Sequence, residues 1–531
     1  MLNLLLFSCA RVGAPNGGTR DSLAPKFLGS NIDTTRLNVS RTVKELRLDF
    51  DEYVMLKDFN KNFNVSPPIK KIKKVIPSNL ANKYVLIQWE DTLQANTTYN
   101  FNFGNAIVDN NESNPLPYFN FAFSTGDKID DLFVSGTVKD AMTLIKENQT
   151  AKDNKMVVGL YKAGENLDYK QKPDYITKVD EENYFELNFL PKGEFVIIAF
   201  DDENQNSVYD AGKEKVSFLK EKITLDSTSV RGLKLKLYPS KKVVKYKESK
   251  AINGGLLMTF EGNPETVDVK SLSEELKDFK VTHAKRSDSV NIWFDAEKSN
   301  LGGTVSKQVK LSYFTPTISD TISVSYKAVK EEFKLSNEAG NLIAPENNFV
   351  INTSLPIENL NTSSWKLESD SIAQDFTAKV SEKNPFKILV NSSFKPTKKY
   401  VLTIPKETVS SYYSSNDKSF QFQFEIDKPE NYGSFTAVIK NKPTAKFWVE
   451  LTNEKGEILY SQFTNASEVS FKNLKPATYI ARIRVDNNGN GFWDEADFAQ
   501  NIAAEDVYIF EKEINVRPLW EIKEDWELTN H

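Results

Sequence analysis

The segment VDNNGNGFWDEAD, residues 485–497, carries oxygen-bearing side chains at alternate positions, as a cation-binding loop does. Counted from the first aspartate, positions 1, 3, 5, 9 and 12 hold Asp486, Asn488, Asn490, Asp494 and Asp497. Calcium takes roughly six to eight oxygen ligands, and a glycine at the sixth position, here Gly491, permits the sharp bend of such a loop. The spacing therefore predicts a calcium site, and its neutral asparagines predict weak binding.

The surroundings of this loop leave a second interpretation open. The preceding YIARIRV, residues 479–485, alternates as a strand does, and Asx side chains between two strands commonly bond their own backbone. An earlier copy has Asp202, Asn204, Asn206 and Asp210 in the same places, but Ser207 replaces the glycine and Lys213 the last carboxylate. The later loop is therefore the better candidate for calcium, and a plain turn is the alternative.

Groups that could transfer protons are scarce in this chain. It has two histidines, His283 and His531, and the segment FKVTHAKRSDS around the first is typical of a surface strand. No GxSxG, HExxH or CxxC motif occurs, and one histidine without an available cysteine does not make a zinc site. The glycine pairs at 17–18, 254–255 and 302–303 lack the helix and lysine of a phosphate-binding loop. We therefore expect no catalytic residues and, apart from weak calcium, no cofactor.

Cys9 is the single cysteine of the chain and directly follows an apolar run, MLNLLLFS. The residues Leu6-Phe7-Ser8-Cys9 resemble a bacterial lipobox, in which a small residue precedes a cysteine that becomes lipidated. The resemblance implies a lipoprotein signal peptide at residues 1–8, with a start that is either truncated or misassigned because no Lys or Arg precedes Cys9. Residues 9–25, rich in Gly, Pro and small polar residues, suit a flexible tether. A stray buried cysteine is the alternative.

Seven Asp-Ser/Thr segments resemble the O-glycosylation sequon of Bacteroidota. The resemblance implies sugar attachment at Ser22, Thr34, Thr92, Ser227, Ser289, Thr321 and Ser371. So short a pattern also arises by chance. Asp-Ser is moreover common in the turns of β proteins, and a plain turn is the alternative. We expect some of the seven to be modified.

The elements that carry these residues are predicted to be strands. Segments such as NKYVLIQWED (82–91) and YFNFAFSTG (118–126) alternate apolar with polar residues between Asn, Pro and Gly clusters, which is typical of half-buried antiparallel strands. SLSEELKDF (271–279) is the best helix candidate. No run of about eighteen apolar residues predicts a membrane-spanning helix. The net charge of −5 has no dominant basic block, which argues against nucleic acid as a partner.

The chain also repeats itself. LQANTTYNFNF (93–103) corresponds to FKPTKKYVLTI (394–404), with Tyr99 opposite Tyr400, and FLPKGEFVIIAFDD (189–202) corresponds to NLKPATYIARIRVD (473–486). The first kind of unit resembles the bacterial Ig-like domain of S-layer and surface proteins. The second, with its Leu-Pro-x-Gly-x-Phe phrase, resembles the transthyretin-like or carboxypeptidase-regulatory-like sandwich.

These resemblances imply an all-β fold of tandem β-sandwiches with little helix. The predicted boundaries are Ig-like domains at 26–127 and 330–427, transthyretin-like sandwiches at 131–240 and 430–518, a sandwich of unknown type at 250–328 and a tail at 519–531.

The leading functional hypothesis is a lipid-anchored outer-membrane protein of a Bacteroidota-like organism. It would act without catalysis, as a structural or interaction subunit accessory to an outer-membrane β-barrel machine that assembles or exports proteins. The cell surface is the expected location, and the periplasmic face stays open. The second hypothesis, a surface glycan-binding or adhesive lipoprotein, requires exposed Trp or Tyr side chains on one face or loop cluster. The third is an extracytoplasmic enzyme with paired carboxylates.

Overall fold

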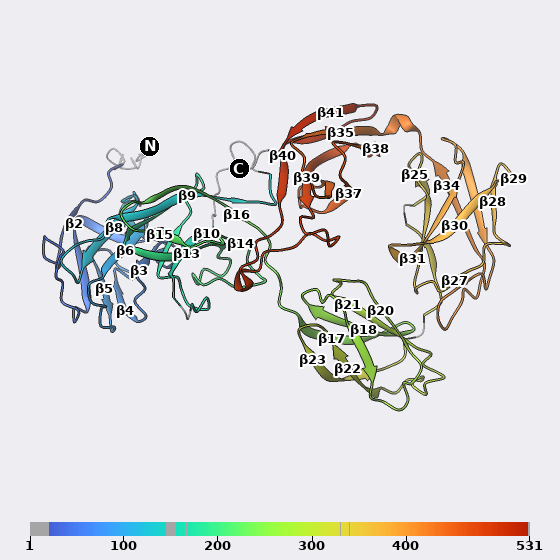
Figure 1. Ribbon diagram of the computed structural model, residues 1–531, viewed down its shortest axis with the longest axis horizontal. Coiled ribbons are helices and arrows are strands. Elements are labelled where there is room, and N and C mark those ends of the chain that lie inside the picture. Colours follow the sequence, from blue (N-terminus) through green and yellow to red (C-terminus); the bar gives the residue numbers. More distant parts are fainter. Residues whose placement is uncertain (1–20, 145–154, 165–166, 330, 339, 529–531) are drawn as a thin grey trace, which may run out of the picture. The chain divides into compact units, whose positions relative to one another are not determined.

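The computed structural model describes residues 21–144, 155–164, 167–329, 331–338 and 340–528, and strands dominate them throughout (Figure 1). The predicted all-β fold class is therefore confirmed. The predicted signal peptide and Cys9 lie outside the described residues. Among the helices that the structure describes, none is long and apolar enough to cross a membrane. Residues up to Leu237 largely form one compact unit, and those from Tyr238 onward a second.

The first sandwich pairs a sheet of order β1–β2–β5–β4, with β7 beside β2, with a sheet of order β3–β6–β8. Alternation in β6 separates the two faces, because Tyr99, Phe101 and Phe103 are buried in the core whereas Asn100 and Asn102 point the other way. The elements are β1 (Phe27–Ser30), β2 (Glu45–Leu56), α1 (Phe59–Asn62), β3 (Asn64–Ser66), β4 (Ile72–Ile76), β5 (Asn82–Trp89), β6 (Thr98–Gly104), β7 (Ile107–Asp109) and β8 (Phe119–Ser124).

The second sandwich has one sheet of order β11–β10–β13–β14, with β15 beside β13, and one of order β12–β9–β16. Its core includes Tyr175, Phe185 and Phe195, which come from both sheets. The strands are β9 (Leu132–Asp140), β10 (Met156–Lys162), β11 (Tyr175–Lys178), β12 (Tyr184–Leu190), β13 (Gly193–Asp201), β14 (Val216–Phe218), β15 (Ile223–Leu225) and β16 (Val230–Leu237).

The third sandwich has sheets of order β17–β18–β21–β20 and β19–β22–β23. The helix expected at 271–279 is absent: β19 ends at Ser271 and turns follow. Leu276 is the only fully buried side chain of that stretch, and a single anchor does not stabilise so short a helix. The strands are β17 (Lys245–Ile252), β18 (Gly255–Glu261), β19 (Asp268–Ser271), β20 (Lys280–His283), β21 (Ser289–Trp293), β22 (Lys307–Phe314) and β23 (Ser319–Tyr326).

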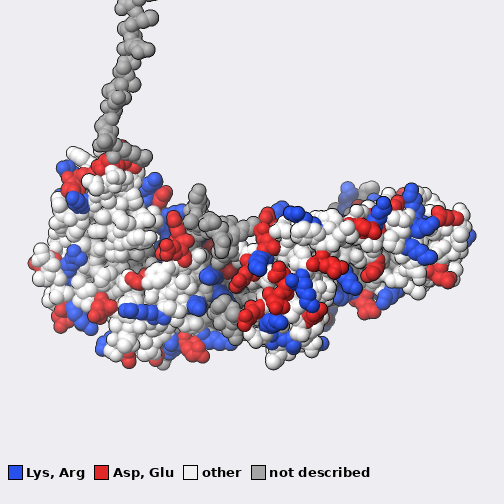
Figure 2. Space-filling view, turned by 90° about the horizontal axis from the view of Figure 1, so that it is seen from above, with Lys and Arg blue, Asp and Glu red and all other residues white. Residues whose placement is uncertain are grey.

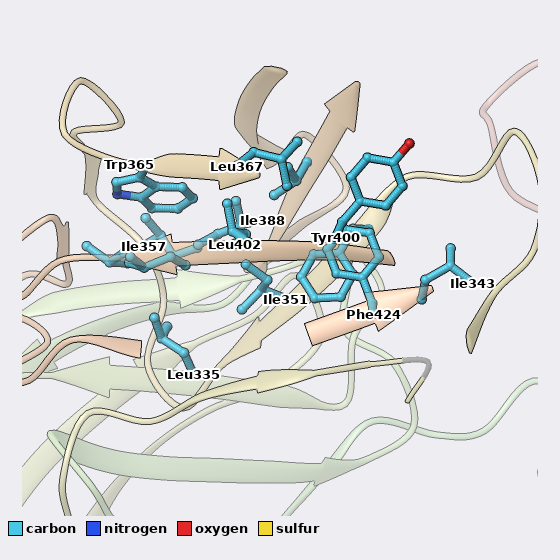
Figure 3. Close-up of a cluster of buried hydrophobic side chains, with 14 of the residues drawn as sticks. Leu335, Ile343, Ile351, Ile357, Trp365, Leu367, Ile388, Tyr400, Leu402 and Phe424 are labelled. Carbon is cyan, nitrogen blue, oxygen red and sulfur yellow. The ribbon is translucent and has the colours of Figure 1, made fainter. Parts of the chain in front are cut away.

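The fourth sandwich has sheets of order β24–β26–β31–β30, β25–β34–β32–β28–β29 and β27–β33. Figure 3 shows its core, where Trp365 and Leu402 lie among aliphatic side chains and the ring of Phe424 stacks beside that of Tyr400. The strands are β24 (Leu335–Asn337), β25 (Leu342–Ile343), β26 (Phe349–Thr353), β27 (Asn359–Leu360), β28 (Lys366–Ser369), β29 (Ile372–Ala373), β30 (Phe376–Ser381), β31 (Asn384–Ser392), β32 (Lys399–Ile404), β33 (Val409–Ser410) and β34 (Phe420–Ile426).

The first and fourth sandwiches share a buried tyrosine that ties down the chain before it. The Tyr99 hydroxyl accepts the N–H of Gln94 at 2.8 Å, and the Tyr400 hydroxyl accepts the N–H of Lys395 at 2.8 Å. Each tyrosine bonds the backbone five residues upstream, as in the tyrosine corner of Ig-like domains.

The fifth sandwich has sheets of order β38–β35–β41 and β37–β36–β39–β40. Across β36 and β39, the buried Glu450 carboxylate accepts hydrogen bonds from Arg482 and Arg484. The elements are η1 (Pro429–Asn431), β35 (Gly433–Lys440), β36 (Phe447–Thr452), β37 (Ile458–Thr464), β38 (Glu468–Leu474), β39 (Ala477–Val485), η2 (Phe498–Gln500), β40 (Val507–Val516) and β41 (Glu521–Glu527).

The prediction of a separate tail at 519–531 is wrong for residues 521–528, which belong to the fifth sandwich. β41 pairs in parallel with β35 along its whole length, and Trp526 and Leu528 are buried in the core. The apolar residues of EIKEDWEL alternate, so one face is covered by the core while the charges face outward. The last sandwich therefore includes β41 and does not end at residue 518.

Candidate functional site

The acidic loop of the fifth sandwich follows β39, and its first aspartate is nearly inaccessible. Asp486 is 3% exposed, and its two carboxylate oxygens accept the N–H groups of Asn490 at 3.0 Å and Gly491 at 2.9 Å. Gly491 has a φ of +81°, a left-handed conformation in which glycine is favoured. The Asp486 side chain therefore closes the loop by binding the backbone of later loop residues.

Asp494 binds two of the three asparagines of the loop. The Nδ2 groups of Asn488 and Asn490 both donate to Asp494 Oδ2, the latter at 2.8 Å, while Arg286 of the third sandwich donates to Oδ1 at 2.6 Å. Burial alone would raise the pKa of the Asp494 carboxyl, but these three hydrogen bonds outweigh it and lower the pKa below its usual range. Four of the five predicted ligands thus lie together.

Asp497, the fifth predicted ligand, has a different partner. Its carboxylate accepts the N–H of Gln500 at 3.2 Å and caps η2. Within the described ranges, no group of three or more His, Cys, Asp or Glu residues is placed to hold a metal ion.

A buried carboxylate from beyond residue 497 binds the loop, and the sequence did not indicate it. Glu505 is 6% exposed, and its oxygens accept the N–H groups of Asn488 at 3.1 Å and Asp494 at 3.0 Å. Burial raises the pKa of Glu505, and these backbone bonds oppose the shift. It lies beyond the repeat of alternating oxygens, so no spacing signal indicates it.

The earlier loop, after β13, has the same hydrogen-bond pattern. The Asp202 carboxylate accepts the N–H groups of Asn206 and Ser207, each at 3.0 Å, and Asn204 donates to Asp210 Oδ2 at 2.6 Å. Ser207 has a φ of +61° where the later loop has its glycine. The two loops therefore share one conformation, whichever residue occupies the bend.

The remaining predicted site residues lie mostly at the surface. Ser289 of β21 is half-buried, and the exposed sequon residues are Ser22, Thr34, Thr92, Ser227, Thr321 and Ser371. His283 is half-buried, with its ring Nε2 3.0 Å from the carbonyl oxygen of Ser287, and His531 lies outside the described residues. Basic and acidic side chains are interspersed on the face shown in Figure 2, without a patch of one sign.

A polar pocket in the first compact unit was not indicated by any motif. It has a volume of about 770 Å³ and lies between the outer face of the β3–β6–β8 sheet and β11 and β12 of the second sandwich. Where these elements meet, Ile176 donates its N–H to Ser66 Oγ at 3.2 Å. The lining is rich in amides, contributed by Asn62, Asn64, Asn100, Asn102, Asn105, Asn120 and Asn188.

Two side-chain oxygens of the lining asparagines lack a protein partner. The side-chain oxygens of Asn64 and Asn100 are buried, and neither has a hydrogen-bond partner among the described residues. Asn100 is 8% exposed overall. Two tyrosines, Tyr118 and Tyr184, also line the pocket and are 69% and 39% exposed. The alternating asparagines of YNFNFGN are the one sequence signal that could have pointed here.

The comparisons with known proteins support the first sandwich specifically. Residues 21–125 match the family model described as bacterial Ig-like domain, which confirms the resemblance expected for residues 26–127. The match covers the first sandwich only. The Ig-like resemblance at 330–427 and the transthyretin-like resemblances stay predictions. No curated protein matches the chain.

Solved structures of surface proteins align over long stretches with low scores. The S-layer protein rSbsC is 12% identical, with 93% of this chain and 67% of that chain covered at a TM-score of 0.15. The SGBP-B protein of the Bacteroides ovatus mixed-linkage glucan utilization locus is 10% identical, with 74% of this chain and 97% of that chain covered at a TM-score of 0.21. BcpA, the major pilin subunit of Bacillus cereus, is 11% identical, with 75% of this chain and 99% of that chain covered at a TM-score of 0.14. Scores this low carry no argument about function.

Proposed function

We propose that the chain is a non-catalytic structural and interaction protein of a bacterial surface that binds a partner protein through an open sheet edge. The proposal rests on the exposed, uncharged edge of strand β37. It is the outer strand of its sheet, none of its seven residues is charged, and Ile458, Leu459 and Phe463 are 46%, 49% and 45% exposed.

Folded proteins rarely leave an uncharged sheet edge exposed to solvent. Unpaired backbone groups on an outer strand recruit another strand, and proteins commonly block this with charged side chains. Some other outer strands of the described structure carry such charges, for example Lys245, Lys247 and Lys250 in β17 and Glu511, Lys512 and Glu513 in β40. On β37 the Phe463 ring instead stacks on Trp448 at 4.4 Å, which holds an apolar surface in place. A strand of a partner protein fits this edge.

The anchor and the class of partner that we propose are those expected from the sequence. A lipid on Cys9 would hold the sandwiches at the outer membrane of a Bacteroidota-like organism, and the tether would let them reach a neighbouring β-barrel that assembles or exports proteins. Cys9→Ser is then expected to move the chain from the membrane fraction to the soluble fraction. Retention in the membrane would contradict lipid anchoring.

The partner is tested by affinity purification from native membranes in mild detergent. We expect an outer-membrane β-barrel protein in stoichiometric amount, and its loss when Leu459→Glu places a charge on β37. Leu80→Glu is the matched control, because Leu80 is 80% exposed in a loop of the first sandwich and its substitution should leave the complex intact. Recovery without any stoichiometric barrel, or equal recovery with Leu459→Glu, would refute the proposal.

A further inference from the structure

The amide-lined pocket of the first compact unit has the chemistry of a ligand site. Its floor is the outer face of the β3–β6–β8 sheet, where register places Asn64 opposite Asn102 and Asn102 opposite Asn120. An amide offers both a donor and an acceptor, so this face is a dense array of both kinds of group. A volume of about 770 Å³ lies within the range of small-molecule sites.

The unpartnered oxygens show that this array is incomplete. A buried polar atom without a hydrogen bond is costly, and folded proteins leave few of them. Asn64 and Asn100 line the pocket and each hold such an oxygen, and Asn100 is more than nine-tenths buried. Both oxygens are covered by protein atoms in this structure, and a ligand hydroxyl would satisfy them once the two side chains turn toward the pocket.

The aromatic rim is held in a fixed position. Tyr118 has a φ of +52°, a strained conformation for a bulky residue. Asn105 Oδ1 accepts the Tyr118 N–H at 3.1 Å, and Asn120 Nδ2 donates to the Tyr118 carbonyl at 2.9 Å. Two pocket asparagines therefore stabilise the turn that presents the exposed ring. Across the pocket lining, the Tyr184 hydroxyl donates to Glu186 at 2.7 Å.

The charges of the lining select against an anionic ligand. Acidic side chains outnumber basic ones in the pocket, with Asp180, Glu181, Glu182 and Glu186 against Lys61 and Lys178. Burial lowers the pKa of Lys178, and Lys61 lowers it further. A neutral ligand with many hydroxyl groups matches the amides, and the C–H face of a sugar ring matches an exposed tyrosine ring.

We propose that this pocket binds a neutral oligosaccharide. The site is independent of the β37 edge, since the pocket belongs to the first compact unit and β37 to the fifth sandwich. Failure of one proposal therefore leaves the other standing.

Isothermal titration of the full chain with cellohexaose, laminarihexaose, maltohexaose and mannohexaose tests this inference. We expect saturable binding of at least one of them and a loss of about tenfold in affinity with Tyr118→Ala, which removes the stacking surface. Tyr118 is mostly exposed, so this variant should fold. Asn64→Ala is expected to weaken binding to a similar degree, with the melting profile as a check of folding.

Tyr53→Ala is the matched control, because Tyr53 is 56% exposed on β2 of the same sandwich and does not line the pocket. Its affinity should equal that of the unchanged chain. The inference is overturned if none of the four sugars binds, or if Tyr118→Ala and Asn64→Ala both bind as the unchanged chain does. Preference for an anionic oligogalacturonate over every neutral sugar would also overturn it.

Discussion

At the scale of single residues, the alternate oxygens of the acidic loop bond mainly within the loop. Asp486 and Asp202 each accept two backbone N–H groups, at positions four and five residues later. The same pattern recurs although one bend has glycine and the other serine. Spacing that resembles a cation loop is therefore also the spacing that lets an aspartate close a tight loop between strands.

From this geometry we expect the plain turn. Asp486→Ala should destabilise the fifth sandwich by about 1–3 kcal/mol, because two backbone N–H groups lose their acceptor. Hydrogen exchange of residues 486–505 should accelerate in the variant, and millimolar calcium should leave the exchange of both proteins unchanged. Saturable protection of the unchanged chain by calcium, absent from Asp486→Ala, would show instead that the loop holds an ion.

At the scale of elements, alternation indicated most strands but not where the last sandwich ends. The strands of NKYVLIQWED and YFNFAF follow from their apolar faces, and the paired tyrosines at 99 and 400 occupy equivalent positions. β41 was missed because EIKEDWEL is highly charged, and only contact with β35 shows that one face is covered. The pocket was missed for a related reason, since it requires two sandwiches to meet.

The role of β41 is tested at its buried tryptophan. Trp526 is 4% exposed and packs edge-on against Phe510, with ring centroids 5.3 Å apart. Trp526→Ala should cost about 3–5 kcal/mol through the cavity it leaves. Hydrogen exchange across the fifth sandwich measures this loss. Trp520→Ala is the matched control, because Trp520 is 49% exposed and its removal should leave exchange unchanged. If Trp526→Ala and Trp520→Ala changed hydrogen exchange equally little, residues 519–528 would behave as the tail expected from the sequence.

At the scale of the whole molecule, each sandwich has its own hydrophobic core, with one exception. The cores of the first, second, third and fifth sandwiches draw only on their own stretches of chain. The core of the fourth also includes Trp293, which ends β21 of the third. Separate cores predict separate unfolding steps, so a single free energy of unfolding does not describe this chain.

Trp293 should couple the third and fourth sandwiches. It is 3% exposed, its ring centroid lies 6.1 Å from that of Phe386, and its Nε1 donates to Thr282 at 2.8 Å. Trp293→Ala removes a side chain that both sandwiches contact, so hydrogen exchange should rise in residues 335–426 as well as in β20 and β21. Trp526→Ala provides the comparison, since its effect should stay within the fifth sandwich. If Trp293→Ala accelerated exchange only in the third sandwich, the two would be independent modules despite the shared core residue.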